Sequence, residues 1–115
     1  MKLSSKFKSL NYLSTLVKNN TSIGIGGHHF ARLPIALINS LLNKNPKNLE
    51  FISWSGGLAL ELFLQKNAVN KIQICFSSLD IFGLAPIFRK TCENKKIEVI
   101  DWSALGLIKA LRAGQ

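Results

Sequence analysis

Apolar and polar positions follow two different periods along this chain. Four short segments rich in Ile, Val and Phe have the composition of buried β-strands, and they predict strands at about 21–26, 49–53, 71–76 and 97–100. Each of these segments is followed by one with apolar residues at helical spacing, and another helical segment precedes the first strand. The predicted helices lie at about 10–18, 34–44, 58–66, 86–93 and 104–112.

Strands and helices that alternate at this spacing predict an α/β fold. Parallel strands joined by right-handed helical crossovers account for the order. We therefore expect residues 1–115 to form one domain, with an open, mostly parallel sheet and helices on both faces. In such a sheet all loops that follow a strand lie on the same edge, where ligands bind. That edge would collect residues 26–32, 53–57, 77–83 and 101–103.

The two edges of the predicted sheet differ in their loop residues. Glycines and serines gather on the edge described above, and Gly26-Gly27 is expected to turn the chain where no Cβ atom fits. Pro34 suits the first position of the next helix, whose free backbone N–H groups can hold an anion or an oxyanion. The opposite loops are turns of Asn, Lys and Pro, with Asn19-Asn20 and Asn67 in left-handed conformations.

Composition excludes several function classes. The net charge of +9 comes from scattered lysines without a basic run interleaved with aromatic residues, so we expect a solvated surface and no nucleic-acid partner. No apolar run approaches the roughly 20 residues that span a bilayer, and we expect no membrane partner. The N-terminus lacks the continuous apolar segment of a signal peptide, which predicts a cytoplasmic location.

Few side chains point to chemistry by themselves. His28 and His29 lack a third histidine, so we expect a polar or partner contact here and no metal site. Cys75 and Cys92 have no metal or redox spacing and are interpreted as reduced thiols. Asp80 and Asp101 fall on the ligand edge as acid–base groups or, more ordinarily, as capping residues.

Serine and tryptophan side chains complete the set of candidates. The serines on the ligand edge have no histidine–acid partner pattern and no nucleophile elbow, which makes them hydrogen-bond donors rather than nucleophiles: Ser53, Ser55, Ser77 and Ser78. Trp54 and Trp102 follow the second and fourth strands. They can stack on an adenine or acyl group, although core packing or a subunit contact explains them as well.

Several of these stretches, taken in order, resemble one enzyme family. Residues 19–27 followed by Arg32-Leu33-Pro34 resemble the N-terminal signature of the family I CoA-transferase alpha subunit, in particular its glutaconate CoA-transferase branch. The same order and spacing continue in residues 82–89, 98–103 and 111–113. The resemblance extends from Ser9 to Gly114 and implies a CoA-transferase-like fold.

The resemblance implies a function and a set of site residues. Such enzymes exchange CoA between an acyl-CoA and a carboxylate, with coenzyme A as substrate and no further cofactor. Their nucleophile is a glutamate of a beta subunit, and none of the glutamates here fits that motif, so we expect no catalytic residue in this chain. The alpha half would form part of the acyl or CoA site, for which we expect these residues: Gly26, Gly27, His28, Ser53, Ser55, Gly56, Ser77 and Ser78.

This sequence departs from the family pattern in two respects. The phenylalanine usual after the paired glycines is replaced by His28, and an aromatic residue, Phe30, follows two positions later. The family's subunit is also much longer, so we expect this chain to be its N-terminal, truncated part. A non-catalytic βα module, either a sugar-phosphate sensor or a partner-binding remnant, stays open as the alternative.

Overall fold

The computed structural model of this protein describes residues 7–114. Most of the N-terminal segment that bears on the signal-peptide prediction, residues 1–6, lies outside the described residues. Helices and strands follow one another in the predicted order. The elements are α1 (Leu10–Ser14), β1 (Ser22–Gly24), α2 (Ile35–Leu42), β2 (Leu49–Ser55), α3 (Gly57–Gln65), β3 (Val69–Phe76), the 3₁₀ helix η2 (Asp80–Phe82), α4 (Pro86–Glu93), β4 (Glu98–Asp101) and α5 (Ala104–Ala113).

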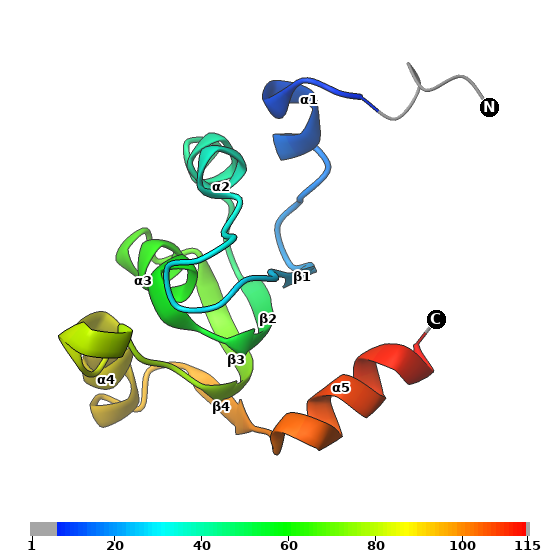
Figure 1. The fold of residues 1–115 in the computed structure, drawn as a ribbon. Coiled ribbons are helices and arrows are strands. Elements are labelled where there is room, and N and C mark those ends of the chain that lie inside the picture. Colours follow the sequence, from blue (N-terminus) through cyan, green and yellow to red (C-terminus); the bar gives the residue numbers. More distant parts are fainter. Residues whose placement is uncertain (1–6, 115) are drawn as a thin grey trace.

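The strands form one sheet in the order β1-β2-β3-β4, and every neighbouring pair is parallel. This arrangement confirms the predicted α/β fold with an open parallel sheet. Helices α2, α3 and α4 lie on one face, as right-handed crossovers between adjacent strands require, whereas α5 lies on the other face (Figure 1). Helices therefore flank both faces, as predicted, but unequally.

The core lies between the sheet and the three helices on its first face. In β2 every second residue is buried, so that Leu49, Phe51, Ser53 and Ser55 face the helices. The ring of Phe51 packs against that of Phe63 in α3, with the ring centroids 5.4 Å apart. As predicted from its apolar composition, α3 is the most deeply buried helix of the described chain.

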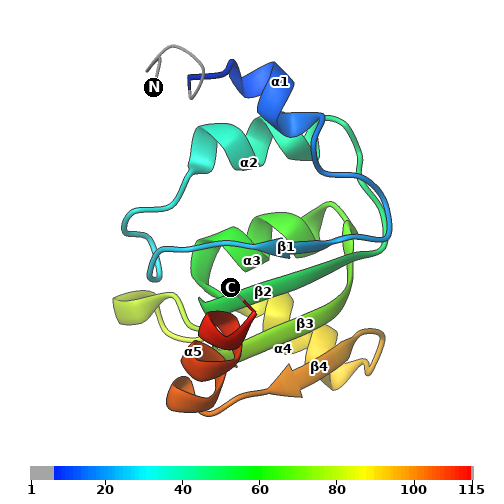
Figure 2. The same ribbon diagram turned by 90° about the vertical axis from the view of Figure 1, so that its right-hand side faces the viewer.

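The second face of the sheet is partly polar. Figure 2 shows that α5 crosses this face only near the carboxyl ends of the strands. Where α5 does not reach, Glu50 accepts hydrogen bonds from Ser22 Oγ and Gln73 Nε2 and lies 3.2 Å from Lys71 Nζ. Trp102 Nε1 donates to Gln73 Oε1 at 2.8 Å, which gives this tryptophan a structural role.

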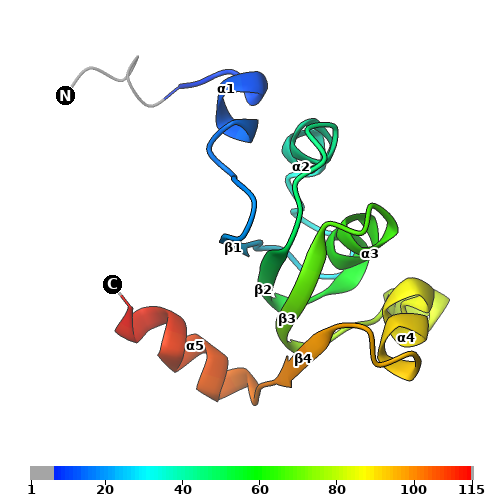
Figure 3. The same cartoon turned by 180° about the vertical axis from the view of Figure 1, so that it is seen from behind.

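Several boundaries differ from the predicted ones; strand β1, for example, covers Ser22–Gly24 and not 21–26. Helix α1 ends at Ser14, and Thr15 Oγ1 then donates to the carbonyl oxygen of Tyr12, a side-chain bond that competes with helix propagation. Helix α1 packs against α2, and it lies beside the sheet rather than on one of its faces (Figure 3). Strand β2 continues to Ser55, which pairs with Phe76, so the expected loop at 53–57 shortens to a turn. Pro34 precedes α2 as its N-cap and is not its first residue.

Within residues 7–114, the helices are all too short or too polar to cross a lipid bilayer.

Candidate functional site

The loops that follow β1, β2 and β3 meet at the carboxyl edge of the sheet, which is the edge predicted to bind ligands. Here the chain from Gly26 to Pro34 forms a tight turn, in which the amide of His28 donates to the carbonyl oxygen of Ala31 at 3.0 Å. This turn reaches across the edge to the start of α3 and to the loop after β3. The three loops are thus in contact with one another.

Gly27 confirms the prediction that the chain turns here where no Cβ atom fits. Its φ is 111°, and a Cβ atom there would lie 2.5 Å from Leu33 Cδ2 and 3.0 Å from the carbonyl oxygen of Ala31. Gly26 is different, because a Cβ atom there would meet nothing within 4 Å and its φ is not positive. The expectation that both glycines are required by backbone geometry is therefore wrong for Gly26.

His29 joins the three loops. Its carbonyl oxygen accepts a hydrogen bond from the backbone amide of Leu58 at 3.0 Å, in the first turn of α3. Gly57 permits this contact, since a Cβ atom there would lie 2.6 Å from the same oxygen. On the other side, His29 Nδ1 lies 3.0 Å from the carbonyl oxygen of Ser78 and 3.1 Å from Ser78 Oγ.

The polar contact expected at the two histidines is made by His29, although its partner Ser78 was not predicted. The backbone of His29 has a φ of 48°, which is uncommon for a residue with a side chain. The sequence signal that was available is the pair of histidines directly after the paired glycines. Because His29 interacts through its backbone oxygen and through Nδ1 with other loops, we assign it a positioning role.

His28 lies in an aromatic cluster at the carboxyl edge of the sheet. Its ring centroid is 5.5 Å from that of Trp54 and 6.0 Å from that of Phe76, and the last two rings are 5.0 Å apart. Trp54 is still 37% exposed and belongs to the face opposite Ser53 and Ser55. Phe76 pairs with Ser55 in the sheet, so the cluster also reaches the face to which Ser53 and Ser55 belong.

The four candidate serines have different surroundings. Ser53 Oγ is within hydrogen-bonding distance of the carbonyl oxygens of Ile25 and Ser55, at 2.8 and 2.9 Å, and ties the end of β1 to β2. Ser78 Oγ contacts His29. By contrast, the hydroxyl oxygens of Ser55 and Ser77 are buried and have no hydrogen-bond partner within residues 7–114.

Ser55 and Ser77 flank Gly56 at the start of α3. A Cβ atom at position 56 would lie 2.6 Å from Ser77 Oγ and 2.8 Å from Leu60 Cδ2. Only a glycine therefore lets the backbone at position 56 come this close to Ser77. A buried hydroxyl without a partner costs free energy unless a ligand or water satisfies it. Among the predicted site residues, these two serines are therefore the best donors to a bound group.

The candidate residues line several small pockets rather than one. Gly26, Ser53 and Trp54 border a pocket of about 220 Å³ together with Leu111 of α5. Ser77 borders another of about 230 Å³ beside α4. The carboxyl edge by itself thus brings the predicted residues close along the sheet without enclosing a single cavity.

None of the chain's four glutamates lies in a loop of the carboxyl edge. Glu50 is in the polar network of the second face, where the hydrogen bond from Ser22 and then that from Gln73 lower its pKa. Glu61 of α3 is buried and accepts the backbone amides of Ile87 and Phe88 at 2.9 and 2.8 Å, so it caps α4. Glu93 pairs with Arg89, and Glu98 begins β4.

Other groups that were weighed as chemical candidates are accounted for. Asp80 begins η2 with a φ of 53°, and Asp101 is exposed at the end of β4. In residues 7–114 no three His, Cys, Asp or Glu side chains gather as ligands of a metal ion. Burial raises the pKa of both thiols, Cys75 and Cys92, which makes them poor nucleophiles.

Comparison with known proteins places this arrangement in a family. A sequence model described as coenzyme A transferase matches residues 10–115. Among solved structures, the crystal structure of a variant of the decarboxylase AibA/AibB superposes with a TM-score of 0.86 at 21% sequence identity. The superposition covers 92% of this chain and 42% of that one, so this chain spans less than half the length of its structural neighbour. No curated protein sequence matches this chain.

Proposed function

This chain belongs to the coenzyme A transferase family, and on that premise we propose that it is the N-terminal part of an alpha subunit of an acyl-CoA:carboxylate CoA-transferase. Its carboxyl edge forms one wall of the site for the acyl group and CoA. A beta subunit supplies the catalytic glutamate. The substrates are an acyl-CoA and a carboxylate, and coenzyme A is exchanged between them.

The observation that carries this proposal is the combination, in the loops of the carboxyl edge, of buried hydroxyl donors without partners and the absence of a glutamate. Ser55 and Ser77 have buried hydroxyls without partners in the described chain, next to the close backbone approach at Gly56. All four glutamates lie elsewhere, in a cap, an ion pair, or on strands away from this edge. A transferase of this family needs a carboxylate nucleophile, and we infer that a glutamate of a beta subunit supplies it.

The proposed chemistry has two stages. The partner's glutamate attacks the thioester carbonyl, the C–S bond breaks, and CoA thiolate leaves an acyl anhydride on the enzyme. The thiolate then attacks the glutamyl carbonyl of the anhydride, which releases the carboxylate and forms a glutamyl-CoA thioester; the second acid reverses these steps. In this scheme Ser55 and Ser77 donate hydrogen bonds to an oxygen on which negative charge develops.

Exposed apolar side chains support the presence of a partner. Ile81 and Phe82 of η2 are 86% and 73% exposed, and the Phe82 ring lies 5.6 Å from that of Phe30, which is itself 42% exposed. These residues lie on the loops of the carboxyl edge. Contiguous apolar surface of this kind is typical of protein contacts, and a partner seated there would also exclude water from the reacting groups.

Borohydride trapping tests the assignment of the nucleophile. The chain is incubated with acetyl-CoA and then treated with borohydride, which reduces a glutamyl-CoA thioester to an alcohol that mass spectrometry locates. We expect no reduced glutamate on the 115-residue chain. When the beta subunit is added together with the rest of the alpha subunit, the reduced residue is expected on the beta subunit. A reduced Glu50, Glu61, Glu93 or Glu98 would overturn the proposal.

The structural neighbour is described as a decarboxylase, so the fold is not restricted to CoA transfer. The assembled complex is therefore also tested with a dicarboxylic acyl-CoA. Release of carbon dioxide without transfer of CoA to acetate would assign a decarboxylase instead of a transferase.

A further inference from the structure

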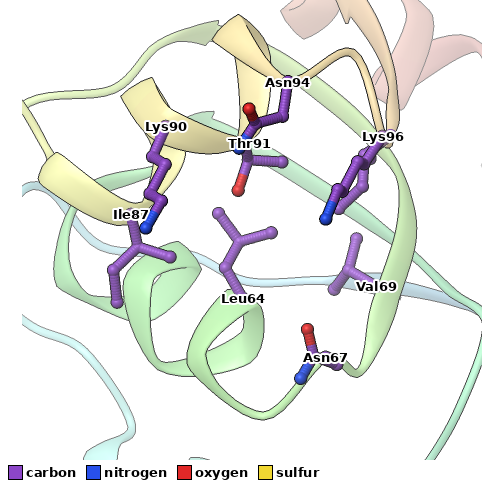
Figure 4. Close-up of a pocket in the computed structure, with 9 residues that line it drawn as sticks. Leu64, Asn67, Val69, Ile87, Lys90, Thr91, Asn94 and Lys96 are labelled. Carbon is purple, nitrogen blue, oxygen red and sulfur yellow. The ribbon is translucent and has the colours of Figure 1, made fainter.

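A larger pocket lies at the opposite end of the sheet. It is enclosed by the C-terminal ends of α3 and α4 and by the amino ends of β3 and β4, and we name it the amino-end pocket (Figure 4). Its volume is about 340 Å³, compared with 220–280 Å³ for four other pockets of the described chain. This volume falls within the range of small-molecule sites.

Two lysines give the amino-end pocket its charge. Lys90 comes from α4 and Lys96 from the turn before β4. Figure 4 shows the amino group of Lys96 directed toward the middle of the pocket, whereas Lys90 runs along the opposite wall and its amino group ends beside Ile87. Within residues 7–114 no carboxylate lines the pocket, and neither lysine forms an ion pair; Glu93 is paired with Arg89 instead. Two unpaired ammonium groups that face one hollow favour a bound anion.

A purely structural explanation of these lysines is that they stabilise the C-terminal ends of the helices. For α3 that contact is made by Lys47, whose Nζ donates to the carbonyl oxygen of Lys66 at 3.4 Å. No such bond to a helix end is made by Lys90 or Lys96 in the described chain. The hydroxyl of Thr91, which also points into the pocket, has no hydrogen-bond partner there either (Figure 4).

The rest of the pocket wall is apolar. Leu64 and Val69 are 5% and 6% exposed and form its floor, together with Ile87 at one side. An inorganic ion would leave this floor in contact with water. An organic anion would cover it and recover the free energy of burying apolar surface.

We propose that the amino-end pocket binds a small organic anion, with its carboxylate or phosphate group between Lys90 and Lys96 and its short apolar body on Leu64. The hydroxyl of Thr91 donates to the same group. The pocket lies beside the first residue of β3, whereas the carboxyl edge lies beyond the eighth. The ligand therefore binds without competing for the site proposed for the acyl group and CoA.

Titrations of the ¹⁵N-labelled 115-residue chain test this site with four probes. Butyrate and butyl phosphate carry both the charge and the apolar body, butyramide lacks the charge, and inorganic phosphate lacks the apolar body. We expect saturable shifts of the Thr91 and Lys96 amides with the first two probes, with a Kd on the order of 1 mM. Binding of butyramide and of inorganic phosphate is expected to be about tenfold weaker or more.

Lysine variants and changes in salt concentration distinguish binding in this pocket from nonspecific attraction of anions to a basic protein. Lys90→Gln and Lys96→Gln are each expected to weaken butyrate and butyl phosphate about tenfold, whereas Lys109→Gln on α5 leaves them unchanged. Raising the ionic strength from about 0.05 to 0.5 M should weaken both probes without any substitution. The proposal is overturned if neither organic anion saturates, if both lysine variants bind normally, or if butyramide or inorganic phosphate binds as tightly.

Discussion

The two ends of this sheet hold left-handed backbone conformations by different means. At the amino ends of the strands, four of the five non-glycine residues with positive φ are asparagines: Asn20, Asn45, Asn48 and Asn67. Asparagine tolerates this conformation through local hydrogen bonds. At the carboxyl ends the corresponding residues are His29, Arg32 and Asp80, accompanied by three glycines. There the conformations depend on contacts between loops.

The difference shows where this fold accepts backbone strain. His29 is held by the amide of Leu58 and by Ser78, residues that lie far from it in the chain. Strained conformations that persist because the surrounding structure fixes them are typical of functional sites. At the amino end the loops at 19–20 and 47–48 are also hydrogen-bonded to each other, for example by Asn48 Nδ2 to Asn20 Oδ1 at 3.1 Å, but asparagine adopts the left-handed conformation with less strain than a longer side chain.

The largest effect is expected at Gly27. Gly27→Val introduces a branched side chain at a φ of 111° and against the carbonyl oxygens of Ala31 and Arg32. Strain and overpacking together should lower the free energy of unfolding by about 3–4 kcal/mol. Gly26→Ala is the matched control, because open space surrounds that position. Urea denaturation measures both, and equal midpoints would contradict the account of this loop.

Next in size is the effect of removing the cap that α3 provides for α4. Helix α4 has no capping side chain of its own, and Glu61 takes this role from a distance. Glu61→Ala leaves two part-buried amides without their acceptor and should cost about 2–3 kcal/mol. The locally capped α5 offers the comparison: Ser103→Ala should cost about 1 kcal/mol. An equal or larger loss at Ser103 would contradict this assignment.

A smaller effect of opposite sign is expected at Arg32. Its φ is 58°, so Arg32→Gly should raise the free energy of unfolding by about 0.5–1 kcal/mol. Asn45, with a φ of 52°, is the control at the amino end, where replacement by glycine should change stability by less than about 0.5 kcal/mol. If both substitutions stabilise equally, the proposed difference between the two ends is wrong.

The smallest effect concerns the polar network between the two ends. Hydrogen bonds from Ser22, Gln73 and Lys71 hold the pKa of Glu50 below its usual value of 4.5. A group with a lowered folded pKa stabilises the protein above its unfolded pKa, and this contribution is lost as the pH falls through the folded value. Glu50→Gln should therefore reduce the loss of stability below pH 4.5, by less than about 1 kcal/mol. Thermal melts from neutral to acidic pH measure it, and an unchanged profile would contradict it.

Much of the fold could be predicted because its signals are local. The alternation of short apolar strands with helical segments indicated four parallel strands, and Asn67 and Pro86 marked the end of α3 and the start of α4. The length of α1 was not predicted, since hydroxyl groups in its last turn compete with the helical hydrogen bonds. Likewise, the ladder partner Phe76 that extends β2 to Ser55 lies beyond any local window of sequence.

The candidate site was only partly readable from the sequence. The predicted topology placed the glycines and serines on one edge, but the sequence did not distinguish the four serines as hydrogen-bond donors. The serines differ in their tertiary contacts. The hydroxyl of Ser53 donates to the carbonyl oxygen of Ile25, whereas the hydroxyls of Ser55 and Ser77 have no partner in the described chain. The contact between His29 and Ser78 joins residues 49 positions apart and has no sequence signature of its own.

The central claim is that the carboxyl edge, and not the amino end, receives the acyl group and CoA. Titrating acetyl-CoA into the ¹⁵N-labelled chain tests it most directly, with Lys90→Gln and Lys96→Gln present so that the amino-end pocket cannot hold the phosphates. We predict saturable shifts of the Gly27, Gly56 and Ser77 amides, with a Kd on the order of 1 mM that Ser55→Ala weakens. Unchanged amides at these positions in the folded chain would contradict the claim.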